Sequence, residues 1–301
     1  MRPRPALIYC ATATIVIAIT ALGWAARSAT ASRPVAQWGA TEDSAESTPA
    51  TAVQPAPTAT STTPSTTATT KPLVHANPVT LNAPGFWSWA LLDQASGTVV
   101  GSPNDNATQV TASMIKSWLA SDYLRLAAAK GSQPSKAALQ QLSIMIRDSD
   151  NNAASATYIS VGKAASITRL IKICGLTDSK AGADWAHTLV SARDAIRMGQ
   201  CIATGQAAGA KWTDWVLNEM RSVRGAGLFG PIEVLPAAEA KQTAIKNGWV
   251  SLKDGNWHVN CLAIGQGWVL AVESVYPVAK GMGIGTANCR SVTQQLMANA
   301  S

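Results

Sequence analysis

The stretch Thr111-Ala112-Ser113-Met114-Ile115-Lys116-Ser117-Trp118 decides how the rest of the chain is interpreted. Ser113 and Lys116 stand three positions apart where helical periodicity begins, so their side chains share one helix face. A serine hydroxyl becomes a good nucleophile when a neighbouring base takes its proton, and a buried lysine can be that base. The pattern alone is weak, because Ser160 and Lys163 repeat it, and we assign no function to that second pair.

The first 78 residues differ in composition from the rest of the chain. Two arginines precede an uncharged run from Ala6 to Ala26, which is long enough to cross a bilayer as a helix with its N-terminus inside. Because Ala29-Thr30-Ala31 could serve as a cleavage site, residues 1–31 are either a cleaved signal peptide or an uncleaved anchor, and the length of the run favours the anchor. Cys10 lies inside this run without a Leu-x-x-Cys at its end, which argues against lipidation. Residues 32–78 are rich in Thr, Pro, Ser and Ala, a composition typical of a disordered spacer.

Residues 79–301 are long enough to form a hydrophobic core. They carry 19 Lys and Arg against 14 Asp and Glu, a net charge of +5, which suits an anionic surface or a cell-wall polymer. They contain no blocks of basic residues interleaved with aromatics, so we expect no nucleic-acid partner. Their four cysteines predict two disulfides in an oxidising compartment, and no Cys-x-x-Cys spacing indicates a metal. From their places on the expected helices and strands we predict the pairs Cys174–Cys201 and Cys261–Cys289.

Hydrophobic periodicity predicts two strands, a block of helices, three more strands and a final helix. The expected strands cover 85–93, 98–100, 243–252, 257–264 and 268–275, and the expected helices cover 113–129, 135–147, 152–161, 164–174, 189–204, 211–220 and 287–297. This order predicts the α+β class, with an antiparallel five-stranded sheet flanked by helices and an inserted all-helical region.

Two further motifs follow Ser113 along the chain. Ser149-Asp150-Asn151 precedes an expected helix, and Lys246-Asn247-Gly248 lies on an expected strand before a hairpin. Separately, each has an ordinary structural explanation, the first as a helix N-cap and the second as an edge-strand lysine near a turn. Together and in this order, the three motifs resemble those of the serine β-lactamase and DD-peptidase superfamily, most closely its class A β-lactamase-like branch. The resemblance covers about residues 80–301.

The resemblance implies a role for each polar side chain. Ser113 would be the acylated nucleophile, and Lys116 would accept or relay its proton. Ser149 would pass a proton to the leaving nitrogen, and Asn151 would hydrogen-bond the substrate amide. Lys246 would supply a positive field that attracts a substrate carboxylate. The resemblance implies no metal and no organic cofactor.

The backbone of the third motif would complete the substrate site. Asn247 and Gly248 would line it, and the N–H groups of Ser113 and Trp249 would form an oxyanion hole. The Trp249 side chain is a further candidate for substrate contact. We predict that the Ser113 hydroxyl and the side chains of Lys116, Ser149 and Lys246 converge between the sheet and the helical block.

Three departures from the family pattern bear on activity. Asn247 stands where the family usually has Thr or Ser, and the segment between Ser113 and Ser149 is shorter than usual. No glutamate occurs between Glu46 and Glu219, so the loop that carries the deacylating glutamate of class A β-lactamases lacks it. In the matching loop, 177–188, only Asp178 and Asp184 are acidic.

The sequence therefore predicts an exported, membrane-tethered or secreted serine acyl-transfer hydrolase that acts as a monomer on a peptidoglycan peptide or a β-lactam. Without the glutamate, the acyl-enzyme should form and then hydrolyse slowly, because general base catalysis is worth about 10²–10⁴-fold. The alternative is a pseudoenzyme that keeps the fold as a wall-binding or interaction module.

Overall fold

The computed structural model describes residues 72–297, and an antiparallel sheet forms the centre of this part. The strand order is β2-β1-β8-β7, and β5 and β6 both pair with the outer side of β7. The strands are β1 (Phe86–Asp93), β2 (Val99–Gly101), β5 (Ala244–Ile245), β6 (Gly248–Ser251), β7 (Asn256–Gly265) and β8 (Trp268–Pro277). The prediction of an α+β fold with an antiparallel sheet is confirmed, and the sheet has six strands in place of the expected five because the expected strand 243–252 is divided into β5 and β6.

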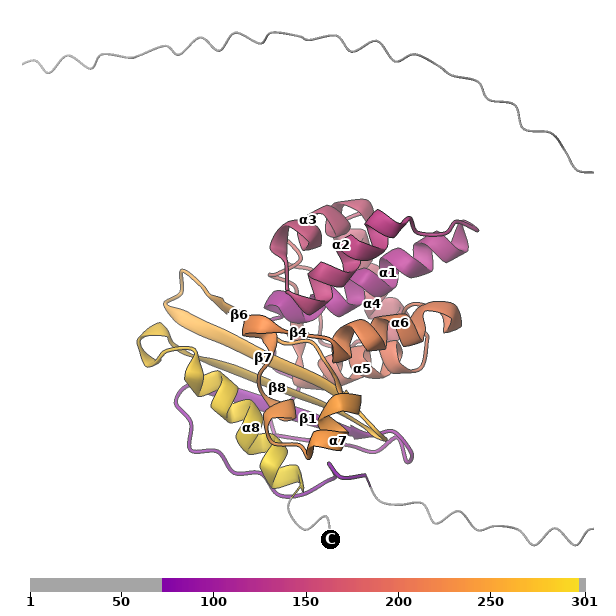
Figure 1. Cartoon of the computed structure of the whole chain (residues 1–301). Coiled ribbons are helices and arrows are strands. Elements are labelled where there is room, and N and C mark those ends of the chain that lie inside the picture. The colour runs from indigo at the N-terminus through magenta and orange to yellow at the C-terminus, as the bar shows by residue number, and fades with distance from the viewer. Residues whose placement is uncertain (1–71, 298–301) are drawn as a thin grey trace, which may run out of the picture. The chain divides into compact units, whose positions relative to one another are not determined.

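Helices cover both faces of the sheet (Figure 1). Helix α8 (Gly283–Met297) lies along one face, and α5 (Ala192–Ala203) lies against the other. Beyond α5 a helical block packs around α1 (Lys116–Ala129), and it comprises α2 (Lys136–Arg147), α3 (Asn151–Ser160), α4 (Ala164–Cys174) and α6 (Ala210–Arg221). The short α7 (Ala237–Gln242) precedes β5. Within residues 72–297, no helix has the length and apolar character to cross a bilayer.

Helix α1 is buried along most of its length, which fixes the position of the residues before it. Trp118, Leu119 and Leu124 are fully buried. The hydroxyl of Ser117 donates to Met114 O at 3.0 Å, and Ser121 donates to Ser117 O at 2.9 Å. Buried polar groups destabilise a core unless they are hydrogen-bonded, so these bonds allow a serine-containing helix to pass through the core.

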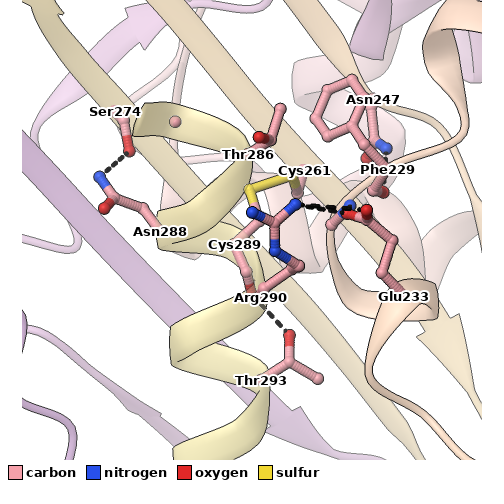
Figure 2. Close-up of a disulfide and its surroundings, with 12 residues drawn as sticks. Phe229, Glu233, Asn247, Cys261, Ser274, Thr286, Asn288, Cys289, Arg290 and Thr293 are labelled. Carbon is pink, nitrogen blue, oxygen red and sulfur yellow. Dashed lines mark hydrogen bonds and ion pairs between the residues drawn. A yellow bond between two sulfur atoms is a disulfide. The ribbon is translucent and has the colours of Figure 1, made fainter. Parts of the chain in front are cut away.

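Two disulfides join the elements as predicted. Cys174 at the end of α4 is bonded to Cys201 of α5, with 5.4 Å between their Cα atoms. Cys261 of β7 is bonded to Cys289 of α8, with 6.3 Å between Cα atoms, so α8 is fastened to the face of the sheet (Figure 2). Closing loops of this size typically stabilises a fold by about 2–4 kcal/mol each.

Several boundaries differ from the sequence prediction. Leu189–Ser191 is a strand, β4, that pairs with β3 (Thr108–Val110), and helix α5 begins only at Ala192. The expected strand 243–252 is divided into β5 and β6, although the amide of Lys246 still donates to Leu262 O of β7. Helix α8 begins at Gly283, one turn before the expected start at 287.

The folded part also begins earlier than expected. Residues 72–78 were expected to belong to the spacer, but Val74 and His75 are buried. The amide of His75 donates to Leu296 O at 3.1 Å, and Asn77 Nδ2 donates to Gln295 O at 2.6 Å, so this segment packs against the end of α8. The expected anchor or signal peptide, and the spacer up to residue 71, lie outside the described residues.

Lys163 offers a test of local strain that is independent of function. It precedes α4 with φ +54° and ψ −124°, a conformation that is nearly restricted to glycine, and its side chain is exposed. We expect Lys163→Gly to raise the free energy of unfolding by about 1 kcal/mol, measured by urea denaturation. Lys163→Ala keeps the Cβ atom and should give no such gain, so an equal gain in both variants would contradict the explanation by backbone strain.

Candidate active site

A pocket of about 280 Å³ lies where the helical block meets the edge strand β6. Ser113, Ser149 and Asn151 line it, together with Ala112, Asp148, Trp185, Ala186, Trp249 and Val250. A larger hollow of about 510 Å³ lies near Trp87 and Trp89, but no ionisable side chain lines it. Of the two, only the first is lined by an ionisable side chain, Asp148, beside the serines of the two motifs.

The turn that carries Ser113 is held from both sides. It is a 3₁₀ turn, Ala112–Ile115, in which Ala112 has φ +45°, an uncommon conformation for a residue with a side chain. The amide of Ala112 donates to Ala186 O at 3.0 Å. Beneath the turn, the buried Asn260 of β7 donates from Nδ2 to Val110 O at 2.8 Å. The sequence analysis did not identify Asn260. A polar residue within an apolar central strand could have indicated a supporting residue of the site.

Lys116 lies one turn after Ser113, and its side chain is fully buried. Its ammonium nitrogen donates to Ser149 O at 2.5 Å and to Asn151 Oδ1 at 2.7 Å, and it lies 3.4 Å from Ser149 Oγ. Burial lowers the pKa of Lys116 to about 7, against the opposing effect of the Asp150 carboxylate. Near neutral pH a substantial fraction of this amine is therefore unprotonated and able to accept a proton.

Ser149 and Lys246 extend this set of contacts to the sheet. Ser149 has φ +59° and occupies the turn before α3, where Asp150 caps the helix by accepting from the amide of Ala153. The Nζ atom of the fully buried Lys246 donates to Ser149 Oγ at 3.0 Å. Burial lowers the pKa of Lys246 well below its ordinary value, and the charge of Lys116 lowers it further. The Ser149 hydroxyl thus lies between two buried lysines from opposite sides of the pocket.

The backbone of β6 presents an amide to this pocket. Lys246 forms a ladder hydrogen bond with Leu262, and the same register pairs Gly248 with Asn260. Hydrogen-bonded pairs alternate along an antiparallel ladder, so the amide of Trp249 points away from β7, toward the pocket. Gly248 is required here, because a Cβ atom at that position would lie 2.9 Å from the amide nitrogen of Ser113.

Asn247 does not face the pocket, which corrects its assignment to the substrate site. Side chains alternate along a strand, so Asn247 points to the opposite side from Lys246. It is fully buried, and its Nδ2 donates to Phe229 O at 2.7 Å and to Gly227 O at 3.1 Å (Figure 2). Asn247 therefore fastens the loop before α7 to the sheet, where the Phe229 ring packs edge-on against Trp249.

The two acidic residues of loop 177–188 have partners away from Ser113. Asp178 accepts from the hydroxyl of Ser191 at 2.7 Å. Asp184 accepts from the backbone amide and the ring of His187 at 3.0 and 2.9 Å. Neither carboxylate lines the pocket. Within residues 72–297, then, these two candidates for the missing base are not placed beside the nucleophile.

Trp185 is a pocket residue that the sequence analysis did not single out. Its ring centroid lies 4.7 Å from Lys116 Nζ, and its indole nitrogen lies 3.2 Å from Ser155 Oγ. Trp185 is the largest side chain in loop 177–188, and that loop had already been matched to the family's active-site loop. Its size and its place in the loop could therefore have indicated a pocket residue.

Solved structures with a similar fold include several β-lactamases. A β-lactamase from Chitinophaga pinensis superposes with a TM-score of 0.62 at 19% identity, over 73% of this chain and 95% of that one. The class A β-lactamase from Mycobacterium abscessus superposes with a TM-score of 0.55 at 14% identity, over 70% of this chain and 94% of that one. The chain has the serine β-lactamase fold.

Comparison at the level of sequence is less informative. No protein-family model matches the chain. A Mycobacterium tuberculosis protein described as "Putative lipoprotein LppW" is 28% identical over 204 residues, which cover 63% of this chain and 63% of that protein. The Mycobacterium bovis protein of the same description matches to the same extent. The match thus spans less than two thirds of the length of these curated relatives.

Proposed function

We propose that the protein is an exported active-site-serine hydrolase that forms an acyl-enzyme on Ser113 with a β-lactam or a peptidoglycan peptide. The observation that carries the proposal is the set of hydrogen bonds joining Lys116, Ser149 and Lys246 in the pocket that Ser113 lines. A buried lysine with a lowered pKa, a bridging hydroxyl and a free backbone amide are the groups that acyl transfer to serine requires.

The proposed reaction begins when Ser113 Oγ attacks the substrate carbonyl carbon. Its proton passes to the neutral amine of Lys116, while the amides of Ser113 and Trp249 bind the oxyanion. As the carbon–nitrogen bond breaks, the Ser149 hydroxyl gives its proton to the leaving nitrogen and recovers one from the lysines beside it. The product is an ester on Ser113, and Asn151 is placed to bind the substrate amide.

Export is part of the proposal. Two disulfides favour an oxidising compartment. The description of the mycobacterial relative as a lipoprotein agrees with a membrane-attached, extracytoplasmic location. A monomer with no metal or organic cofactor remains our expectation.

Incubation with a penicillin, followed by intact-mass measurement, tests the proposal. We expect a covalent adduct of one penicillin per chain that persists for many minutes, because Asp148, the carboxylate that lines the pocket, is paired with Arg224 and is not free to activate water. Rapid hydrolysis without an accumulated adduct would make the protein an efficient β-lactamase instead. If neither an adduct nor hydrolysis is detected, the result would favour the pseudoenzyme. The orientation of the Asn247 side chain, away from the pocket, also favours that alternative.

A further inference from the structure

The indole of Trp185 lies directly against the amine that the proposed reaction uses as its base. Its ring centroid is 4.7 Å from Lys116 Nζ, a distance at which a cation is attracted to the face of an aromatic ring. The ring is held in place, since its indole nitrogen donates to Ser155 Oγ of α3 at 3.2 Å. The following residue, Ala186, accepts from the amide of Ala112 at 3.0 Å.

This arrangement leaves no route for water to Lys116. Three oxygen atoms already lie within hydrogen-bond distance of the Nζ atom, namely Ser149 O, Ser149 Oγ and Asn151 Oδ1. The Trp185 ring covers a further approach, and the exposed fraction of the lysine is 0%. A water molecule entering the pocket can therefore reach the ester on Ser113 without reaching the base.

Within residues 72–297, neither the candidate carboxylates nor Lys246, which is fully buried and donates to Ser149 Oγ at 3.0 Å, is placed to replace it. The carboxylates of Asp178 and Asp184 are bonded to Ser191 and His187 and do not line the pocket. The carboxylate that does line it, Asp148, forms a two-point ion pair with Arg224, at 2.5 and 2.9 Å. Hydrolysis of the ester consequently depends on whether water can meet Lys116.

We propose that Trp185 sets the lifetime of the acyl-enzyme by excluding water from Lys116. Hydrolysis needs the water oxygen to attack the ester carbonyl while a base takes the water proton, after which Ser113 Oγ leaves and is reprotonated. With the indole in place, the base cannot take the water proton, so the ester persists. The inference rests on the proposed function, since it concerns the second half of the same reaction.

The experiment compares Trp185→Ala with the matched variant Trp185→Phe, which keeps an aromatic ring over the lysine. Each protein is acylated with penicillin and freed of excess reagent, and the decay of the adduct is followed by intact mass between pH 6 and 9. We expect the alanine variant to lose the adduct at least about tenfold faster, a part of the 10²–10⁴-fold that a general base supplies. The phenylalanine variant should stay within about threefold of the wild type.

The pH profile separates this role from a merely structural one. If water gains access to Lys116, the decay rate of the alanine variant should rise with pH as the amine loses its proton. That rise should level off once the amine is neutral. Faster decay that has no pH dependence, or that keeps rising in proportion to hydroxide concentration, would mean that the loop has only loosened, and it would overturn the inference. Equal lifetimes in the wild type and in Trp185→Ala would also overturn it, while leaving the proposed function intact.

Ser155→Ala provides a second variant that should not disturb folding, because Ser155 is exposed. Loss of the indole's hydrogen-bond partner should free the ring and shorten the adduct lifetime, by less than Trp185→Ala does. If the adduct lifetime is unchanged in both Ser155→Ala and Trp185→Ala, the inference is overturned even if one of the two variants is poorly folded. Absence of both an adduct and penicillin hydrolysis in the wild type would instead overturn the proposed function, and the inference with it. Rapid hydrolysis without an adduct would overturn the inference alone.

Discussion

Replacing Ser113 by alanine should abolish the covalent penicillin adduct completely. Ser113 lines the pocket from the 3₁₀ turn that precedes the buried helix α1, and its amide lies beside Gly248 of the edge strand. Without its hydroxyl no ester can form, whatever the state of the neighbouring lysines. Labelling with a fluorescent penicillin, followed by denaturing electrophoresis, should show no signal for Ser113→Ala at any incubation time.

The chain supplies a matched control for this experiment. Ser160 and Lys163 repeat the Ser-x-x-Lys spacing, but Ser160 Oγ donates to Thr157 O and Lys163 is exposed at the start of α4. Ser160→Ala should therefore label like the wild type. Labelling that survives in Ser113→Ala would show that penicillin reacts elsewhere, and the assignment of the nucleophile would be lost.

The candidate site could be predicted from the sequence because each motif combines a chemical group with a local structural signal. Ser113 stands where a helical pattern begins, Asp150 is a helix cap, and Lys246 stands shortly before a hairpin turn. Helix starts and turns are determined within a few residues, so they can be predicted locally. The contacts of Lys116 with Ser149 and of Ser149 with Lys246 span 33 and 97 positions, and only the resemblance to a known family indicated them.

The features that were missed depend on pairing between distant segments. Leu189–Ser191 continues the apolar pattern of the following helix, and it is a strand only because Thr108–Val110 lies beside it. Asn260 acts through a carbonyl 150 positions earlier in the chain. Trp185 gains its role from a lysine on another element, which no local pattern in loop 177–188 reveals.

The pseudoenzyme alternative is weakened by the state of the buried charges. Burial opposes the charged forms of both Lys116 and Lys246, and the charge of Lys116 further opposes that of Lys246, so holding the two lysines near one another is unfavourable. A binding module has no need of such an arrangement, whereas a proton relay does. Strained backbone at Ala112 and Ser149, both in the pocket, indicates a site that retains unfavourable local geometry for a purpose.

Replacing Lys116 by methionine should lower the rate constant for acylation by about 10²–10⁴-fold, the usual contribution of a general base. Methionine keeps most of the length and apolar character of the side chain but cannot take the proton of Ser113. In the wild type, the pKa of about 7 means that the amine is protonated and inactive well below pH 7 and neutral above it. The acylation rate should therefore rise between about pH 6 and pH 8 and then level off, as expected for a base with this pKa.

The matched control is Lys163→Met, which makes the same substitution at an exposed lysine and should leave both the rate and its pH profile unchanged. Quenched-flow acylation followed by mass measurement provides the rates. The residual reaction of Lys116→Met should lack the rise centred near pH 7, because the group that titrates there has been removed. If that rise persisted at reduced amplitude, the titrating base would be Lys246, whose Nζ lies 3.0 Å from Ser149 Oγ, and the roles of the two lysines would have to be exchanged.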